Sequence, residues 1–123
     1  MISTYAKVIG VILLLIGILG FIPGLTPNDL LFGMFLVSPM HNVIHMISGL
    51  IFVGVGFSEN WELARKTTLA FAAIYGLITV LGFISPDSTV MGMPMNMADN
   101  VLHLVITVTA LMFGLPQRYA MPR

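Results

Sequence analysis

Two short segments of the chain carry residue types and a spacing that could bind a cofactor. They are residues 40–45, Met-His-Asn-Val-Ile-His, and residues 98–103, Ala-Asp-Asn-Val-Leu-His. In each, an Asn stands three residues before a His and an ionisable residue stands four before it. Residues four apart on a helix share one face, with Cβ atoms about 5–6 Å apart. Each segment should therefore present a pair of ionisable side chains on one helix face.

If the two faces meet, four potential metal ligands converge: His41, His45, Asp99 and His103. Three imidazoles and a carboxylate suit Zn²⁺, Fe²⁺ or Mn²⁺, and ligands four apart are commonly presented by helices. Asp99 and His41 each occupy a helix-start position that has its own structural explanation. The metal hypothesis therefore depends most on His45 and His103.

A second hypothesis is axial ligation of haem or another tetrapyrrole by His45 and His103. Equivalent depth on two helices of a four-helix bundle is the arrangement that a bis-His haem requires. The sequence has no haem-attachment motif, and 123 residues are few to enclose a macrocycle. This hypothesis ranks just below the divalent metal.

Copper is a third hypothesis, because Met91, Met93, Met95 and Met97 alternate in one run. Soft thioether ligands select Cu(I). The alternative is that the run is a flexible apolar surface at the membrane interface, since Met often fills such positions without binding metal.

The same residues also fit a purely structural role. Neutral His45 and His103 could hydrogen-bond across the bundle to polar side chains at similar depth, namely Asn42, Asn100, Tyr75 and Thr79. Asp99 would then be a helix-start carboxylate stabilised by the helix dipole. Under this alternative the cluster is an interhelical hydrogen-bond network and binds nothing.

The composition identifies the environment of these segments. Hydrophobic residues make up 58% of the chain, charged residues 8%, and the mean hydropathy is +1.01, against roughly 25% charged residues in globular proteins. The sequence therefore predicts an integral membrane protein in a lipid bilayer. A net charge of zero without a basic stripe argues against nucleic acid. We expect no enzyme, because no nucleophile has a flanking base and no phosphate loop occurs.

Four apolar segments should cross the membrane, at about residues 3–22, 39–57, 63–84 and 97–115. Ser38 as N-cap and Pro39 at the first helical position define the start of the second span. Asn96 as N-cap and Asp99 three residues later do so for the fourth, as in a capping box. The fold class is thus all-α, a single-domain membrane four-helix bundle.

The chain reads as an internal duplication. Leu-Gly-Phe-Ile at 19–22 recurs at 81–84, and Asn-Val-Ile-His at 42–45 recurs as Asn-Val-Leu-His at 100–103. One repeat covers about residues 3–57 and the other about 63–115. Each holds two spans, so the two repeats should be parallel, related by a pseudo-two-fold axis along the membrane normal.

The basic residues predict the orientation. The two long connections between spans contain none, and all five lie at the termini or in the middle loop: Lys7, Arg65, Lys66, Arg118 and Arg123. Because positive residues stay inside, both termini should be cytoplasmic. The two connections and the starts of the second and fourth spans then face outward.

The motifs Leu-Gly-Phe-Ile-Pro, His-Asn-Val-Ile-His-Met-Ile-Ser-Gly and Ala-Asp-Asn-Val-Leu-His-Leu carry a resemblance to a known family. The chain resembles small four-span bacterial membrane proteins that form a domain of unknown function with two Asn-x-x-His motifs. The resemblance covers nearly the whole chain and implies the bacterial plasma membrane, without an assigned activity or cofactor. A homo-oligomer or a larger membrane complex remains open, and the Met run is not part of the family pattern.

Overall fold

A computed structural model describes residues 1–116 and contains four α-helices in that range. They are α1 (Ile2–Leu19), α2 (Pro39–Phe57), α3 (Trp61–Ile84) and α4 (Met97–Gly114). All four are long and apolar enough to cross a membrane. The predicted all-α membrane bundle is therefore confirmed. Arg118 and Arg123, on which the orientation partly depends, lie outside the described residues.

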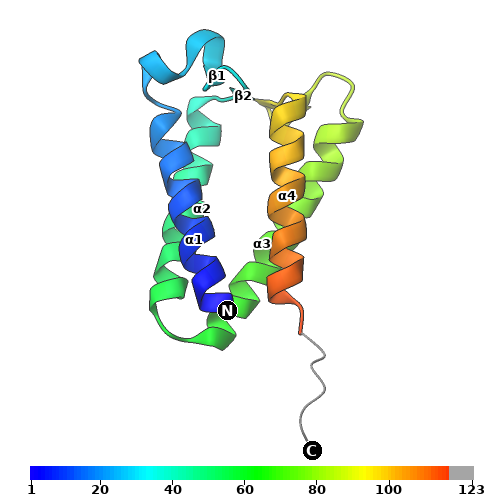
Figure 1. Ribbon diagram of the computed structural model, residues 1–123. Coiled ribbons are helices and arrows are strands. Elements are labelled where there is room, and N and C mark those ends of the chain that lie inside the picture. Colours follow the sequence, from blue (N-terminus) through cyan, green and yellow to red (C-terminus); the bar gives the residue numbers. More distant parts are fainter. Residues whose placement is uncertain (117–123) are drawn as a thin grey trace, which may run out of the picture.

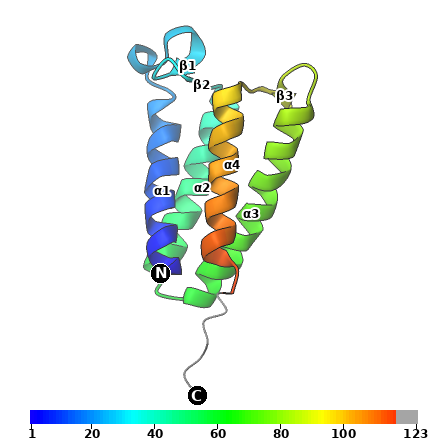
Figure 2. The same cartoon turned by 45° about the vertical axis from the view of Figure 1, so that its right-hand side comes forward.

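Both long connections lie at one end of the bundle, opposite the N-terminus (Figures 1 and 2). The first contains two short 3-10 helices, η1 (Pro23–Leu25) and η2 (Pro27–Asp29), and the hairpin of β1 (Leu30–Leu31) with β2 (Phe35–Leu36). The second contains the hairpin of β3 (Thr89–Val90) with β4 (Met93–Pro94). We call the end with these connections the hairpin end.

The helices associate as two pairs, α1 with α2 and α3 with α4, and packing within each pair is far more extensive than between the pairs. Glycines bring α1 and α2 together, because a Cβ on Gly49 would lie 2.5 Å from the backbone nitrogen of Leu14 and one on Gly10 would lie 2.7 Å from that of Val53. Such close backbone approach is typical of helix packing in lipid.

Aromatic rings fill the centre of the bundle and lead toward the hairpin end. Phe52 and Phe71 have ring centroids 4.7 Å apart, and Phe71 and Tyr75 have centroids 6.2 Å apart. Tyr75 in turn faces His45, with ring centroids 6.4 Å apart. These aromatic rings therefore pack below the predicted His site, on the side of the bundle centre.

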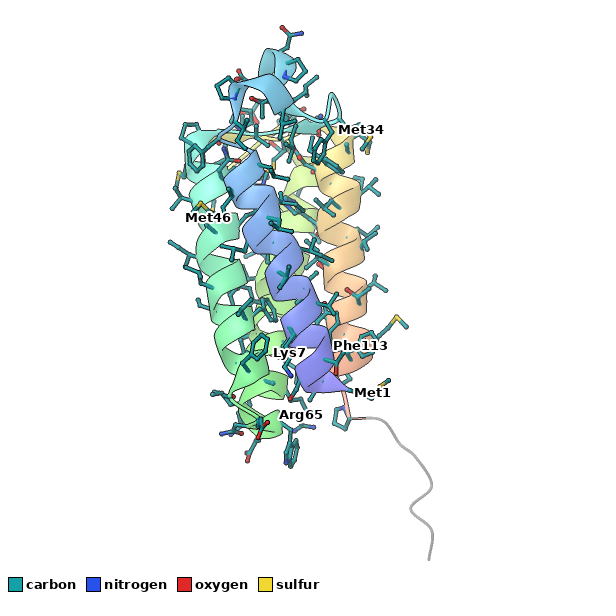
Figure 3. The ribbon with its side chains drawn as sticks, turned by 60° about the vertical axis from the view of Figure 1, so that its left-hand side comes forward. Met1, Lys7, Met34, Met46, Arg65 and Phe113 are labelled. Carbon is teal, nitrogen blue, oxygen red and sulfur yellow. The ribbon has the colours of Figure 1, made fainter. Side chains whose placement is uncertain are left out.

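The basic side chains of the described residues lie toward one end of the bundle. Lys7 and Arg65 lie toward the end that holds Met1, whereas Met34 lies at the hairpin end (Figure 3). Lys66 pairs with Glu62 at 3.0 Å on the exposed start of α3. The basic residues of the described chain are therefore at the end away from the hairpins.

Candidate metal centre

The start of α2 positions two of the three histidines. Ser38 is the N-cap and its Oγ accepts a hydrogen bond from the His41 backbone N–H at 3.3 Å, while Pro39 takes the first helical position. Proline suits that position because its missing N–H would have no helical partner there. The predicted helix start is confirmed, and it places His41 and His45 on one face, a turn apart.

The start of α4 positions the third histidine. Asp99 N donates to Asn96 Oδ1 at 2.9 Å, and Asn96 N donates to Asp99 Oδ2 at 3.1 Å, which completes the predicted capping box. Asn96 Nδ2 also donates to Met34 O at 2.7 Å, which ties this helix start to the first connection. His103 follows Asp99 by one turn.

The three imidazoles meet in the interior between α2 and α4, and all three are buried. One ring nitrogen from each lies within 4.8 Å of the other two. His41 Nε2 and His45 Nε2 are 2.7 Å apart and hydrogen-bonded. Ligands about 2.0–2.1 Å from a tetrahedral ion lie about 3.3 Å from one another. Small side-chain rotations would therefore suffice for the three nitrogens to bind one ion.

The space beside the imidazoles is small. A cavity of about 10 Å³ is lined by the three histidines and five further side chains, namely Ile44, Tyr75, Ile78, Met93 and Met95. This volume corresponds to about one water-sized sphere. A single ion fits such a space, whereas the plate of a tetrapyrrole does not.

The hydrogen bonding of the cluster is incomplete. Tyr75 Oη lies 3.5 Å from His45 Nδ1, at the long limit for a hydrogen bond. His103 Nδ1 is buried and has no hydrogen-bond partner among residues 1–116. Leaving a buried polar atom unpaired costs roughly 1–3 kcal/mol. A hydrogen-bond network that leaves one of its own buried nitrogens unpaired is therefore a poor explanation of the cluster.

Asp99 is placed apart from the three histidines. Its carboxylate is committed to the helix start, and the group of potential ligands within 4.8 Å contains His41, His45 and His103 only. The predicted four-ligand set thus appears in the structure as three imidazoles. The helix-start position of His41 would by itself explain a structural role for this residue. Its ring nevertheless belongs to the three-histidine cluster.

The two predicted partner asparagines pack on glycines. A Cβ on Gly20 would lie 2.1 Å from Asn42 Oδ1, and one on Gly82 would lie 2.2 Å from Asn100 Oδ1. Asn100 Nδ2 also donates to Gly82 O at 3.2 Å. Each Asn therefore packs the start of one helix against the end of its paired helix, and Asn100 is also hydrogen-bonded there. The repeated Gly and Asn motifs in the sequence were a signal for this pairing.

Tyr75 and Thr79 are the other two predicted hydrogen-bond partners of the histidines. Tyr75 lies beside the histidines, whereas the Thr79 hydroxyl bonds elsewhere. Thr79 Oγ1 donates to Tyr75 O at 2.7 Å and lies 3.5 Å from Thr107 Oγ1. Thr79 therefore belongs to the packing of α3 against α4, one turn beyond Tyr75.

These features define a class of protein: a multi-pass membrane bundle with a buried three-histidine cluster near one end. Residues 3–116 match the family described as a domain of unknown function (DUF4383), so the chain belongs to that family. No curated protein and no solved structure matches the chain.

Proposed function

We propose that this protein is a membrane metal-binding protein that holds one transition-metal ion between His41, His45 and His103. The observation that carries the proposal is the convergence of three buried imidazoles, with one nitrogen of each within 4.8 Å of the others. Imidazole is a ligand common to Zn, Cu, Fe and Ni sites. No ligand comes from Asp99 in this proposal.

Haem is the weaker candidate for the same residues. A bis-His haem needs its two axial imidazoles on opposite faces of a flat macrocycle. Here a third imidazole packs against both, since the His41 ring centroid lies 4.4 Å from that of His45 and 5.5 Å from that of His103. A cavity of about 10 Å³ leaves room for an ion and none for the ring system.

The alternative function is structural, with the cluster acting as an interhelical hydrogen-bond network. The 2.7 Å bond between His41 and His45 and the approach of Tyr75 favour it. The unpaired His103 Nδ1 favours the metal instead. The two functions differ in whether the purified protein retains an ion.

The proposed setting is the bacterial plasma membrane with both termini in the cytoplasm. The position of Lys7 and Arg65 at the end away from the hairpins supports this orientation (Figure 3). The metal centre then lies in the outward half, below the outer headgroups, and serves an accessory binding role and not catalysis. Association into a homo-oligomer or a larger membrane complex is compatible with that role.

We also propose that the fold arose by duplication of a two-helix unit. The shared features that support it are the hairpin before α2 and before α4, and the Asn-on-Gly contact at Gly20 and at Gly82. Each unit contributes to the centre, the first with His41 and His45 and the second with His103.

The test is metal analysis of the full-length protein purified in mild detergent. We expect close to one equivalent of a transition metal in the wild type and none in His45→Ala. Thr68→Val is the control, since Thr68 is equally buried but lies near the start of α3, away from the cluster. A folded wild type that retains and accepts no metal would overturn the proposal, and a Soret band lost in His45→Ala would favour haem.

A further inference from the structure

The run of four methionines divides into two pairs with different surroundings. Met93 and Met95 are buried, each 3% exposed, and both line the cavity beside the three histidines. Met91 and Met97 are 75% and 63% exposed. Met93 begins β4 and Met95 lies two residues on, so both side chains take the same, inward side, toward the candidate metal centre. Met91 lies in the turn and Met97 begins α4, and both point outward.

The second hairpin holds the inward pair in place by backbone hydrogen bonds. Met93 pairs with Val90 in the antiparallel register, and Met95 N donates to Ser88 O at 2.7 Å. Gly92 occupies the turn with φ +79°, a conformation that glycine adopts without strain. The position of Met93 and Met95 is thus a property of the folded hairpin.

A carboxylate fixes the base of the same hairpin. Asp87 Oδ1 accepts hydrogen bonds from Ser85 Oγ at 2.7 Å and from Thr89 Oγ1 at 2.8 Å. These bonds stabilise the charged form and lower the pKa of Asp87. The carboxylate therefore stays ionised at neutral pH and holds Ser85 and Thr89 together at the base of the hairpin.

We propose that the ion at this centre is Cu(I), and that one thioether, from Met93 or Met95, joins the three imidazoles to make a four-coordinate site. This inference rests on the proposed function of the His cluster. Thioethers are soft ligands that select Cu(I), whereas Zn²⁺ is usually held by imidazole, thiolate or carboxylate. A mixed set of imidazoles and thioethers in an apolar space without an acidic ligand favours a singly charged soft cation.

The competing explanation is that Met93 and Met95 are packing residues only. They form an apolar cluster with Val90, against which Ile44, Ile78 and Leu81 pack. Leucine is close to methionine in volume and such exchanges are well tolerated. Replacement of both residues by Leu therefore preserves the packing and removes only the sulfur atoms.

The experiment compares two double variants of the full-length protein in detergent: Met93→Leu/Met95→Leu and, as the matched control from the same run, Met91→Leu/Met97→Leu. Each is titrated anaerobically with Cu(I) against a chromophoric Cu(I) chelator, and separately with Zn²⁺. We expect the inward variant to lose Cu(I) affinity by at least about tenfold and to keep its Zn²⁺ affinity. The outward variant should match the wild type in both titrations.

X-ray absorption at the copper edge provides the second measurement. The Cu(I)-loaded wild type should show sulfur scattering that is absent from the Met93→Leu/Met95→Leu variant. Unchanged Cu(I) affinity and no sulfur scattering, with metal binding still lost in His45→Ala, would overturn the copper inference and leave the His centre standing. A wild type that binds neither Cu(I) nor Zn²⁺ would overturn both.

Discussion

At the scale of single residues, His103 separates the two candidate functions best. It is the sole imidazole of the cluster contributed by α4, its ring centroid lies 5.9 Å from that of His45, and its Nδ1 has no hydrogen-bond partner in residues 1–116. In a hydrogen-bond network its removal would leave the bond between His41 and His45 intact. In a metal centre its removal deletes one of three ligands.

We therefore predict that Zn²⁺, used as a redox-inert probe, raises the apparent Tm of the wild type and not that of His103→Ala. A ligand at one hundred times its Kd adds about 2.7 kcal/mol to the free energy of unfolding. Thermal unfolding in detergent with and without Zn²⁺ measures the effect. Thr107→Val, one turn further along α4, is the control and should keep the full shift. An equal shift in His103→Ala would contradict the three-ligand centre.

Replacement of Asp99 should leave metal binding unchanged, in contrast to His103, because the structure gives Asp99 a capping role only. Replacement by Ala removes the acceptor for Asn96 N, one of the two hydrogen bonds of the capping box, and such a bond contributes about 0.5–1.5 kcal/mol. We predict that Asp99→Ala lowers the apparent Tm while its metal stoichiometry equals that of the wild type.

Asp99→Asn is the matched variant, since an amide oxygen can still accept from Asn96 N. It should unfold nearer the wild-type temperature. Loss of bound metal in folded samples of both variants would show instead that the carboxylate is a ligand.

At the scale of secondary-structure elements, the glycines of α2 differ sharply in their surroundings. A Cβ on Gly49 would meet the α1 backbone at Leu14, whereas a Cβ on Gly54 would have nothing within 4 Å. Both lie inside the same helix, so their helix propensities cancel in a comparison. The difference between them reports only the contact with α1.

We predict that Gly49→Ala destabilises the protein, by about 1–3 kcal/mol as is usual for overpacking. Gly54→Ala should be neutral or slightly stabilising, because Ala is favoured over Gly in helices by about 1 kcal/mol. Unfolding of the two variants in the same detergent measures the contrast. Equal stability would mean that α1 and α2 do not approach through Gly49.

The helices could be predicted from sequence more completely than their contacts. Apolar length gave four spans, and the caps at Ser38 and Asn96 gave the starts of α2 and α4. The packing of Asn42 on Gly20 depends on the distance between two helices, which hydropathy does not encode. The end of α1 also differed, at Leu19 and not Ile22, because residues 20–22 form a turn before Pro23.

The candidate site was predictable in its location and less so in its membership. The spacing of four residues identified His41, His45 and His103 as candidate ligands. It also predicted Asp99 as a ligand, because a carboxylate that caps a helix and one that binds a metal look alike in sequence. The split of the methionine run required the structure, because a continuous strand would place all four side chains on one face. The turn at Met91 and the start of α4 at Met97 break that pattern.

At the scale of the whole molecule, orientation in the membrane can be tested with single cysteines, since the native sequence has none. Met91→Cys lies on the exposed second hairpin and Glu59→Cys on the exposed turn between α2 and α3. We predict that an impermeant maleimide labels Met91→Cys in intact bacteria and labels Glu59→Cys only after lysis.

A reporter fused after Arg123 gives an independent measure and should lie in the cytoplasm. Labelling of Glu59→Cys in intact cells, with Met91→Cys protected until lysis, would invert the orientation and place the His centre in the inner half of the membrane.

The arrangement of the helices as two pairs has a kinetic consequence. The imidazoles come from α2 in one pair and α4 in the other, while direct packing between the pairs is sparse. A bound ion would therefore cross-link the pairs, and the exchange of that ion would require them to part or the second hairpin to lift. Its residence time would then be governed by the opening rate of the protein, and not by the lability of the individual metal–ligand bonds.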